Sequence, residues 1–225
     1  MALNKSKGQM YECVTHTWSP IIGCIHQCKY CYVKAFRDLP VKPFIKENDF
    51  PNLGKDRVIF VGHTCDMFGE NTPQEWVKRV FDHCQKYPDN KYVFQTKNPL
   101  KLVRDFGTLP TNFMIGTTIE TNRKELLAQY SQAPPPIERA KGLSLVTGEK
   151  FVTIEPIMKF DVEPFIELLK LAKPDWVNIG ADSKRHHLPE PTMKEIQAFV
   201  VELEIAGITI RKKMNLGRLV GNAST

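Results

Sequence analysis

The chain has 225 residues, the length of a single domain with a sizeable core, and we expect residues 1–225 to form one domain. Its 31 Lys and Arg residues exceed its 25 Asp and Glu residues, and the net charge of +6 suits an anionic partner without by itself indicating nucleic acid. No apolar run has the length that crosses a bilayer, and the first residues lack the apolar stretch of a signal peptide, so we expect a cytoplasmic protein with no membrane partner.

Short apolar runs alternate with helical patterns along the chain. The run Val58–Val61 is apolar without alternation, which is typical of a strand buried on both faces. The helical patterns begin at Thr72 and Pro73, and cover 164–172 and 192–206, where Gly207 ends the last one. The expected strands are 11–17, 57–62, 91–96, 113–118, 150–154, 175–180 and 208–212.

This alternation predicts parallel strands joined by right-handed crossovers. The order fits an α/β fold, a partial TIM-type (β/α)6 barrel with a possible seventh strand. In such barrels the active site lies at the carboxyl ends of the strands. Polar residues that directly follow each strand are therefore the candidates for a functional site.

Two proline-rich segments interrupt the pattern. Residues 38–56 contain Pro40, Pro43 and Pro51, too many for a continuing helix, and we expect a lid or a hairpin over the barrel mouth. Residues 131–136 end in three consecutive prolines, which predicts a stiff polyproline connection.

Three closely spaced cysteines, Cys24, Cys28 and Cys31, follow the first expected strand in the pattern C-x3-C-x2-C. Soft thiolate ligands suit iron–sulfur clusters, and three of them can hold three irons of a 4Fe-4S cluster. The fourth iron would remain open for chemistry. We expect Cys13, in the first strand, and Cys84, in the helix after the second, not to be ligands.

A structural zinc ion is the alternative reading of this cluster. His16 or His26 would complete a Cys3His site with the three cysteines. Zinc sites usually use two separated pairs of ligands, however, and the sequence has no second pair. Disulfide bonds are disfavoured because a cytosol is reducing.

The cysteine spacing, with Tyr30 before the last cysteine, closely resembles the motif of the radical S-adenosylmethionine (SAM) superfamily. The resemblance implies that SAM chelates the open iron through its amino and carboxylate groups. It also implies that the reduced cluster cleaves SAM to a 5′-deoxyadenosyl radical, with an electron donor such as flavodoxin or ferredoxin. The partial barrel is the fold that this resemblance implies.

The resemblance also suggests roles for the strand ends. Tyr30 matches the aromatic residue that lies beside the SAM adenine, and residues 62–64 stand where the superfamily often has a Gly-Gly-Glu that binds the methionine amine. This chain departs from that motif, and Asp66 is the nearest carboxylate. The expected SAM-binding residues are Tyr30, Gly62, His63, Thr64, Asp66, Thr96, Thr118, Glu120, Glu155, Asn178 and Gly180.

Two further residues are candidates for catalysis. Lys97, in a Thr-Lys pair, resembles the corresponding pair of spore photoproduct lyase and its relatives, and it can neutralise a carboxylate or phosphate as a point charge. Cys65 follows the second strand, and its thiol would be a good hydrogen-atom donor to a carbon radical. The alternative for Lys97 is a solvated loop lysine, and for Cys65 a small buried residue.

Basic residues follow the sixth and seventh expected strands. Lys184, Arg185, Lys212 and Lys213 would bind phosphate oxygens of DNA or of a nucleotide if the two runs meet at one rim, and would otherwise be ordinary solvated charge. A base inside a stacked duplex cannot enter a barrel, so such a substrate must be flipped out or single-stranded.

The strand-end residues together resemble a compact set of radical-SAM-like proteins common in phage genomes. That resemblance is specific for the cofactor and the fold, but the set has no single agreed substrate. Among radical SAM enzymes that act on a nucleic-acid base, we favour a phage-type DNA thymine modification, namely isomerisation of an amino-acid adduct on thymine, in a phage-infected bacterial host. Three alternatives stay open. They are a thymine photolesion lyase, a radical SAM enzyme on a free metabolite or peptide, and a non-enzymatic iron–sulfur or zinc protein that binds nucleic acid.

Overall fold

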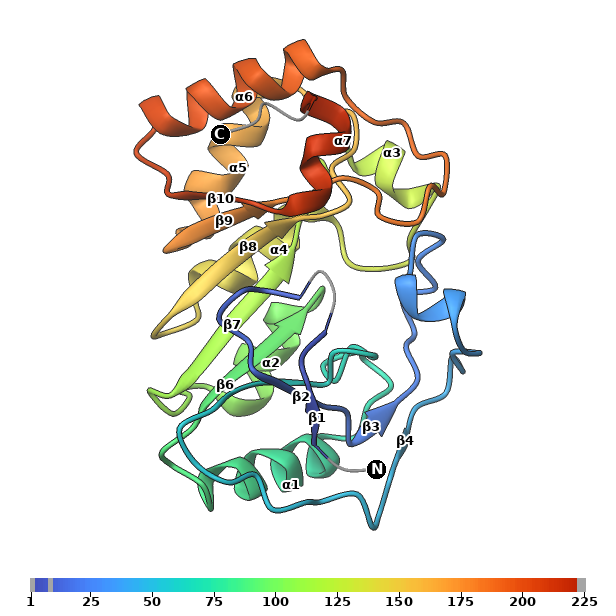
Figure 1. Ribbon diagram of the computed structural model, residues 1–225, viewed down its shortest axis with the longest axis vertical. Coiled ribbons are helices and arrows are strands. Elements are labelled where there is room, and N and C mark those ends of the chain that lie inside the picture. The colour runs from blue at the N-terminus through green and yellow to red at the C-terminus, as the bar shows by residue number, and fades with distance from the viewer. Residues whose placement is uncertain (1–2, 8–9, 222–225) are drawn as a thin grey trace.

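The protein is an α/β domain built on one eight-stranded sheet, as seen in a computed structural model that describes residues 3–7 and 10–221 (Figure 1). The strands follow one another across the sheet in chain order, and all neighbours are parallel except the antiparallel pair at the β1 edge. The strands are β1 (Asn4–Lys5), β2 (His16–Trp18), β5 (Val58–Val61), β6 (Lys91–Thr96), β7 (Phe113–Thr118), β8 (Lys150–Ile154), β9 (Trp176–Ile179) and β10 (Ile210–Lys212).

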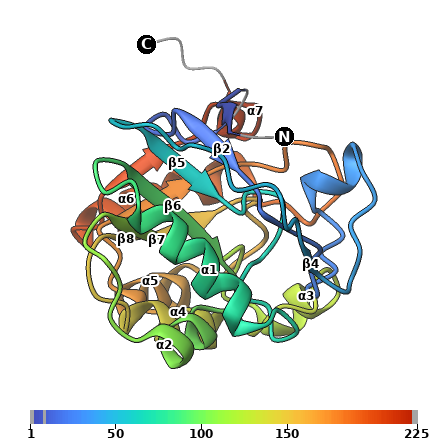
Figure 2. The same cartoon turned by 90° about the horizontal axis from the view of Figure 1, so that it is seen from below.

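The helices lie mainly on one side of this sheet, where Figure 2 shows α1, α2, α4 and α5 together. None of the helices in the described ranges is both long and apolar enough to cross a membrane. The α-helices are α1 (Gln74–Gln85), α2 (Pro99–Phe106), α3 (Lys124–Ala128), α4 (Pro136–Ser144), α5 (Val162–Ala172), α6 (Met193–Ile205) and α7 (Gly217–Val220), and the 3-10 helices are η1 (Tyr32–Ala35) and η2 (Met214–Leu216).

Local sequence explains where several helices begin. Thr192 caps α6 by accepting a hydrogen bond from the Glu195 backbone, and the Glu195 carboxylate accepts one from the Thr192 backbone in return. Asn98 caps α2 through the backbone amide of Lys101. Pro136 is the first residue of α4, where a backbone N–H would have no helical hydrogen-bond partner. The last residue of the expected polyproline connection therefore belongs to a helix.

The hydrophobic core has one part on each face of the sheet, and a third cluster packs Cys28 and Tyr30 of the cysteine loop against Met158. The larger part lies between the sheet and the helices and includes Ile59, Val61 and Phe94. A smaller cluster occupies the opposite face, where Phe151 stacks on Trp176 at a centroid distance of 5.1 Å. Because side chains alternate along a strand, this second face continues beyond the cluster with polar residues toward the strand ends.

The first expected strand is shorter than the sequence predicts. Only His16–Trp18 forms β2, and the preceding residues turn across the open face of the sheet, with Cys13 in an exposed turn and not in a strand. Tyr11 explains this course, because its ring packs against Phe60 and Phe151 of the smaller core. An apolar contact across several strands thus overrides local strand propensity.

The segment 38–56 has two parts with different positions. Its first part reaches the cysteine loop, where β4 (Phe44–Ile45) pairs with β3 (Ile21–Ile22), a strand outside the segment, so the pairing is not a hairpin within residues 38–56. Its second part runs toward α1, where Phe50 packs against Trp18 and His83. The expected lid therefore does not extend through the whole segment.

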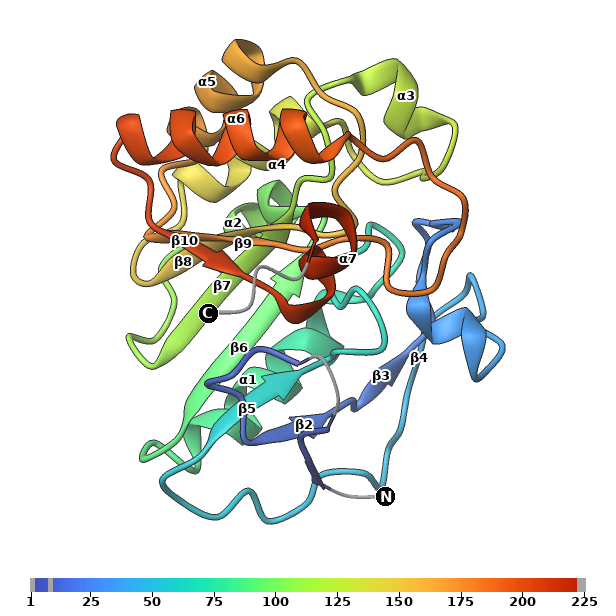
Figure 3. The same ribbon diagram turned by 45° about the horizontal axis from the view of Figure 1, so that its top comes forward.

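The sequence-based strand order is confirmed, including the seventh parallel strand β10. The described pairings give an open sheet that ends at β1 and β10, so a closed barrel is not formed by these strands. Figure 3 shows the N-terminal strands and the C-terminal strands at opposite ends of the sheet.

Replacing Gly116 with Ala should destabilise the fold. A Cβ atom at this position would lie 2.3 Å from the Phe151 ring, and overpacking of this kind costs about 1–3 kcal/mol. Chemical denaturation of Gly116→Ala measures the loss. The double variant Gly116→Ala/Phe151→Leu should recover part of it, and equal stability of the two variants would contradict this packing explanation.

Candidate functional site

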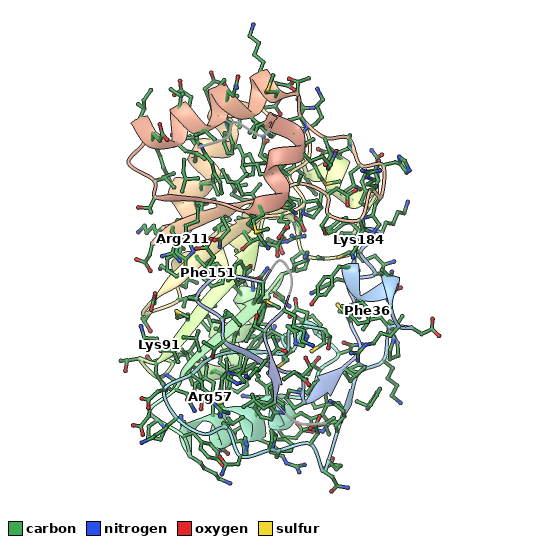
Figure 4. The ribbon with its side chains drawn as sticks, in the orientation of Figure 1. Phe36, Arg57, Lys91, Phe151, Lys184 and Arg211 are labelled. Carbon is green, nitrogen blue, oxygen red and sulfur yellow. The ribbon has the colours of Figure 1, made fainter. Side chains whose placement is uncertain are left out.

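A cavity of about 550 Å³ opens where the parallel strands end. Figure 4 places Lys184 and Phe36 on this side of the sheet, while Arg57 and Lys91 lie at the opposite ends of the strands. Loops after β2, β5, β6, β8 and β9 contribute to its wall. The structure thus brings the polar strand ends together, as the parallel topology predicts.

The three clustered cysteines all line this cavity, and all are free thiols. The backbone amide of Cys24 donates to Pro40 O, and Cys28 Sγ lies 3.1 Å from Ser131 Oγ. Residues 130–132 also bind the loop through main-chain hydrogen bonds, including Gln132 N to His26 O at 2.8 Å. The cysteine loop is therefore held from both sides by segments distant in sequence.

The donor set of this loop fits an iron–sulfur cluster. Within the described residues, no three His, Cys, Asp or Glu side chains converge closely enough to hold a single metal ion. A cubane does not need such convergence, because each cysteine binds a different iron. Three thiols around a shared cavity therefore match a 4Fe-4S cluster better than a Cys3His zinc site.

Asp66 joins the cysteine loop to the sheet. Its carboxylate accepts hydrogen bonds from Thr96 Oγ1 and Lys97 N, both at 2.7 Å, and lies 2.8 Å from Nε2 of the buried His26. Burial raises the pKa of Asp66, but the adjacent His26 and these hydrogen bonds outweigh it and lower the pKa to about 2. A fully partnered carboxylate of this kind positions the loop, and Asp66 also lines the cavity.

Glu120 is the centre of a second buried cluster. It accepts from Tyr30 Oη at 2.5 Å and from Arg139 at 2.8 Å, and Lys97 Nζ lies 3.4 Å away. Burial by itself raises the pKa of Glu120, but the charges of Arg139 and Lys97 outweigh burial and lower the pKa to about 2. Glu120 lies outside the cavity lining and is fully buried, and its hydrogen bonds position Tyr30 and Arg139.

The loop after β5 offers an unpartnered hydroxyl to the cavity. Gly62 has φ of +74°, and a Cβ there would lie 2.6 Å from Met67 Sδ, so glycine is required for this turn. Thr64 lines the cavity, is buried, and its Oγ1 has no hydrogen-bond partner within the described chain. An orphaned buried hydroxyl is suited to a polar group of a bound molecule.

Glu155 and Lys213 form an ion pair in the cavity wall with an Nζ–Oε2 distance of 2.5 Å. Asn215 donates to the other carboxylate oxygen at 2.6 Å. A Cβ on Gly180 would lie 2.9 Å from the Glu155 carboxyl, so this glycine makes room for Glu155, whereas the sequence suggests close approach to adenine. The pairing also means that Lys213 is not a free phosphate ligand.

Most of the predicted site residues meet in the cavity. Those that line it, besides the three cysteines, are Tyr30, Gly62, His63, Thr64, Cys65, Asp66, Thr96, Lys97, Thr118, Glu155, Lys184 and Lys213. Glu120, Asn178, Gly180, Arg185 and Lys212 do not. Arg185 instead lines a smaller surface hollow with Asp182 and Arg218, and Lys212 is exposed on the edge strand β10.

Sequence reasoning missed part of the site. Tyr11, Gln95 and Thr153 also line the cavity, at the face of the sheet opposite the helices. Strand alternation offered a signal for two of them, because Gln95 and Thr153 each lie two residues after a residue of the smaller core. Tyr11 had no such signal, because its place depends on a turn and not on a strand.

Residues 9–195 match the sequence model of the family described as "Protein of unknown function (DUF5131)". The chain belongs to this family. No curated protein matches the sequence. The family assignment therefore carries no activity with it.

Solved structures with this fold are found among SAM-binding proteins. A spore photoproduct lyase mutant has a TM-score of 0.59 at 13% identity, covering 77% of this chain and 57% of that one. A spore photoproduct lyase mutant with bound AdoMet and dinucleoside spore photoproduct has a TM-score of 0.56 at 13% identity, with the same coverage. Streptococcus suis SuiB bound to S-adenosylmethionine has a TM-score of 0.57 at 13% identity, covering 87% of this chain and 49% of that one.

These similarities establish the shared fold, since the sequences are too different to carry more. The member of the DUF5131 family described here spans 57% of the lyase chain and 49% of the SuiB chain. The α/β fold with a mostly parallel sheet is consistent with the fold expected from the radical SAM resemblance, and the expected barrel is not confirmed.

Stability of the protein should fall as the pH drops from about 6.5 to about 4. Burial, with Arg37 and Lys46 nearby, lowers the pKa of His63 to about 4, so the unfolded state binds the proton first in this range. The effect should be at most about 3 kcal/mol, since one pKa unit corresponds to about 1.4 kcal/mol. Urea denaturation of wild type and His63→Gln across this range measures it. A variant with the same pH dependence as wild type would contradict the assignment to His63.

Proposed function

We propose that the protein is a radical SAM enzyme that acts on a base of a nucleic acid. The observation that carries the proposal is the convergence of three free cysteines, an orphaned hydroxyl and polar strand ends on one cavity, in a fold shared with SAM-bound proteins. Cys24, Cys28 and Cys31 would hold a 4Fe-4S cluster, and the loop from Gly62 to Thr64 would face the methionine end of SAM.

With cluster and SAM bound, the chemistry supplied is reductive cleavage of SAM to a 5′-deoxyadenosyl radical, which needs an electron donor such as flavodoxin or ferredoxin. The chain's own residues orient the reactants. Asp66 fixes the cysteine loop through His26, and Glu120 fixes Tyr30 and Lys97 at the cavity wall. Burial favours neutral Lys97, but Glu120 beside it outweighs this and raises its pKa, so this lysine presents a positive charge to an anionic group.

A cationic rim supports a nucleic-acid substrate. It consists of Lys34, Phe36, Arg37 and Lys184, with Phe36 57% exposed and its ring 6.0 Å from that of the cavity residue Tyr32. The three cations are exposed and have no carboxylate partner within the described residues. Cations for phosphates beside an exposed aromatic ring are the features that bind single-stranded nucleic acid.

Within this class we favour isomerisation of an amino-acid adduct on thymine, with lysis of a thymine photolesion as the alternative. Cys65 lines the cavity, and its thiol contacts Gly62 O at 3.6 Å. In the lyase reaction its S–H bond would break as a C–H bond forms on the substrate radical, leaving a thiyl radical. An isomerase needs no such donor, because the hydrogen returns from 5′-deoxyadenosine.

Replacing Cys28 with Ala should abolish cluster assembly and SAM cleavage, because two thiolates cannot hold three irons. Iron and sulfide content after anaerobic reconstitution, and 5′-deoxyadenosine formed after reduction, are the measurements. The matched control is Cys13→Ala, which removes an exposed thiol outside the cavity and should keep both signals. Full cluster content in Cys28→Ala, or no 5′-deoxyadenosine from the reconstituted wild type, would refute the proposal.

The rim variant Lys34→Ala/Arg37→Ala/Lys184→Ala should bind single-stranded DNA more weakly, and its salt slope should fall by up to about 2, at about 0.7 per phosphate contact. Uncoupled SAM cleavage should persist. The control Lys78→Ala/Lys86→Ala/Lys170→Ala removes equal charge from α1, its carboxyl end and α5. Equal slopes for the two triple variants would show that net charge alone, and not the rim, attracts the DNA.

A further inference from the structure

Four polar side chains form the floor of the cavity, namely Tyr11, Gln95, Thr118 and Thr153. We propose that this floor binds a carbonyl group of the substrate, and that it selects a keto pyrimidine such as thymine over an amino pyrimidine such as cytosine. This inference rests on the proposed function, because it names the substrate class of the same site.

One hydrogen-bond chain connects the four side chains. Tyr11 Oη donates to Gln95 Oε1 at 2.5 Å, and Gln95 Nε2 donates to Thr118 Oγ1 at 2.8 Å. Tyr11 Oη also lies 2.7 Å from Thr153 Oγ1. The four residues come from the N-terminal segment and from β6, β7 and β8, and all line the cavity.

The chain fixes the direction of each hydrogen bond. The phenol hydrogen of Tyr11 is used on Gln95, so the Thr153 hydroxyl must donate its own hydrogen to the Tyr11 oxygen. The Gln95 carbonyl is occupied by the phenol, which turns its amide nitrogen toward Thr118. Tyr11 therefore decides which end of the Gln95 amide is available to a ligand.

The group of the floor that can only donate is the Gln95 amide nitrogen, which keeps one of its two hydrogens. Thr118 keeps its hydroxyl hydrogen and one acceptor lone pair, so it can follow whichever group Gln95 selects. Burial raises the pKa of Tyr11, so the phenol stays protonated and the chain keeps its direction. Donors recognise acceptors, and a carbonyl oxygen is the neutral group that fits them.

This pattern discriminates between pyrimidines of equal size. Thymine presents a carbonyl oxygen at the position where cytosine presents an amino group. The amino group would place its hydrogens against that of the Gln95 amide nitrogen and leave this half-buried donor unpaired. A site built in this way rejects the wrong group more strongly than an apolar pocket does.

Tyr11 is accordingly a positioning residue for specificity. In Tyr11→Phe the Gln95 amide loses the partner of its carbonyl and becomes free to turn, which exposes an acceptor to the ligand. A merely structural role for Tyr11 would change affinity for both pyrimidines equally. A role in specificity changes their ratio.

The test compares single-stranded dT8 and dC8 as probes with the reconstituted enzyme and SAM at one salt concentration. The measured quantity is the dissociation constant for dC8 divided by that for dT8. The contribution of phosphate contacts cancels in this ratio, because both probes have the same number of phosphates. We expect a ratio of about 10 or more for wild type, since one good pair discriminates by about 1–3 kcal/mol. Tyr11→Phe should bring it close to 1.

The matched control is Tyr92→Phe, which also removes a buried hydroxyl. Tyr92 Oη bonds to the carbonyls of Cys84 and Tyr87 at 2.9 Å and lies away from the cavity, so this variant should keep the wild-type ratio. If Tyr11→Phe does not fold, Gln95→Met removes the amide itself and should also bring the ratio close to 1.

A wild-type ratio near 1, or an unchanged ratio in the variants of Tyr11 and Gln95, would overturn the inference. Formation of 5′-deoxyadenosine by the same preparation separates this result from failure of the proposed function. If 5′-deoxyadenosine forms and the ratio is 1, the floor does not read a carbonyl. If none forms, the radical SAM proposal itself fails.

Discussion

Two buried carboxylates hold the site together. Asp66 binds His26 of the cysteine loop, and Glu120 binds Tyr30 of the same loop, while both also contact residues of the strand ends. The loop is otherwise largely irregular, with short strands and one 3-10 helix, and cannot fix its own cysteines. Loss of one partner from such a buried pair typically costs about 3–5 kcal/mol. The geometry of the three thiols therefore depends on these two anions together with the main-chain hydrogen bonds to Pro40 and residues 130–132.

The carboxylates at the strand ends all have partners within the protein. A buried anion is stable only when its oxygens are fully paired, and Asp66 and Glu120 use theirs on the cysteine loop and on Arg139 and Lys97. Glu155 follows the same rule with Lys213 and Asn215. The cavity wall thus carries paired charges, while its unpaired polar group is the neutral Thr64 hydroxyl.

The sequence allowed the fold and the position of the site to be predicted, because both depend on local patterns. Apolar runs such as Val58–Val61 identify the strands, and parallel order places their ends at one edge. The partners of each side chain could not be predicted, because they depend on long-range contacts. Glu120 meets Arg139 from a helix that the pattern did not reveal, and Tyr11 reaches Gln95 only because its segment leaves the expected strand.

The consecutive lysines Lys212 and Lys213 have different surroundings, which the sequence did not predict. Consecutive lysines suggest one charged surface, but alternation along β10 separates them. Lys213 points into the cavity and pairs with Glu155, while Lys212 is exposed outside it. Among the described residues, Lys34 and Arg37 of the cysteine loop are exposed cations without a carboxylate partner, and the sequence analysis did not single them out.

The charge of the cavity changes from its rim to its floor. The rim is cationic, the wall carries neutralised ion pairs, and the floor is neutral and rich in hydrogen-bond donors. A nucleotide has the opposite distribution, with anionic phosphate at one end and a neutral base bearing carbonyl groups at the other. Phosphate left at the rim and a base inserted to the floor would satisfy both ends at once. For the nucleotide substrate proposed above, this distribution of charge favours an orientation with the phosphate at the rim and the base toward the floor.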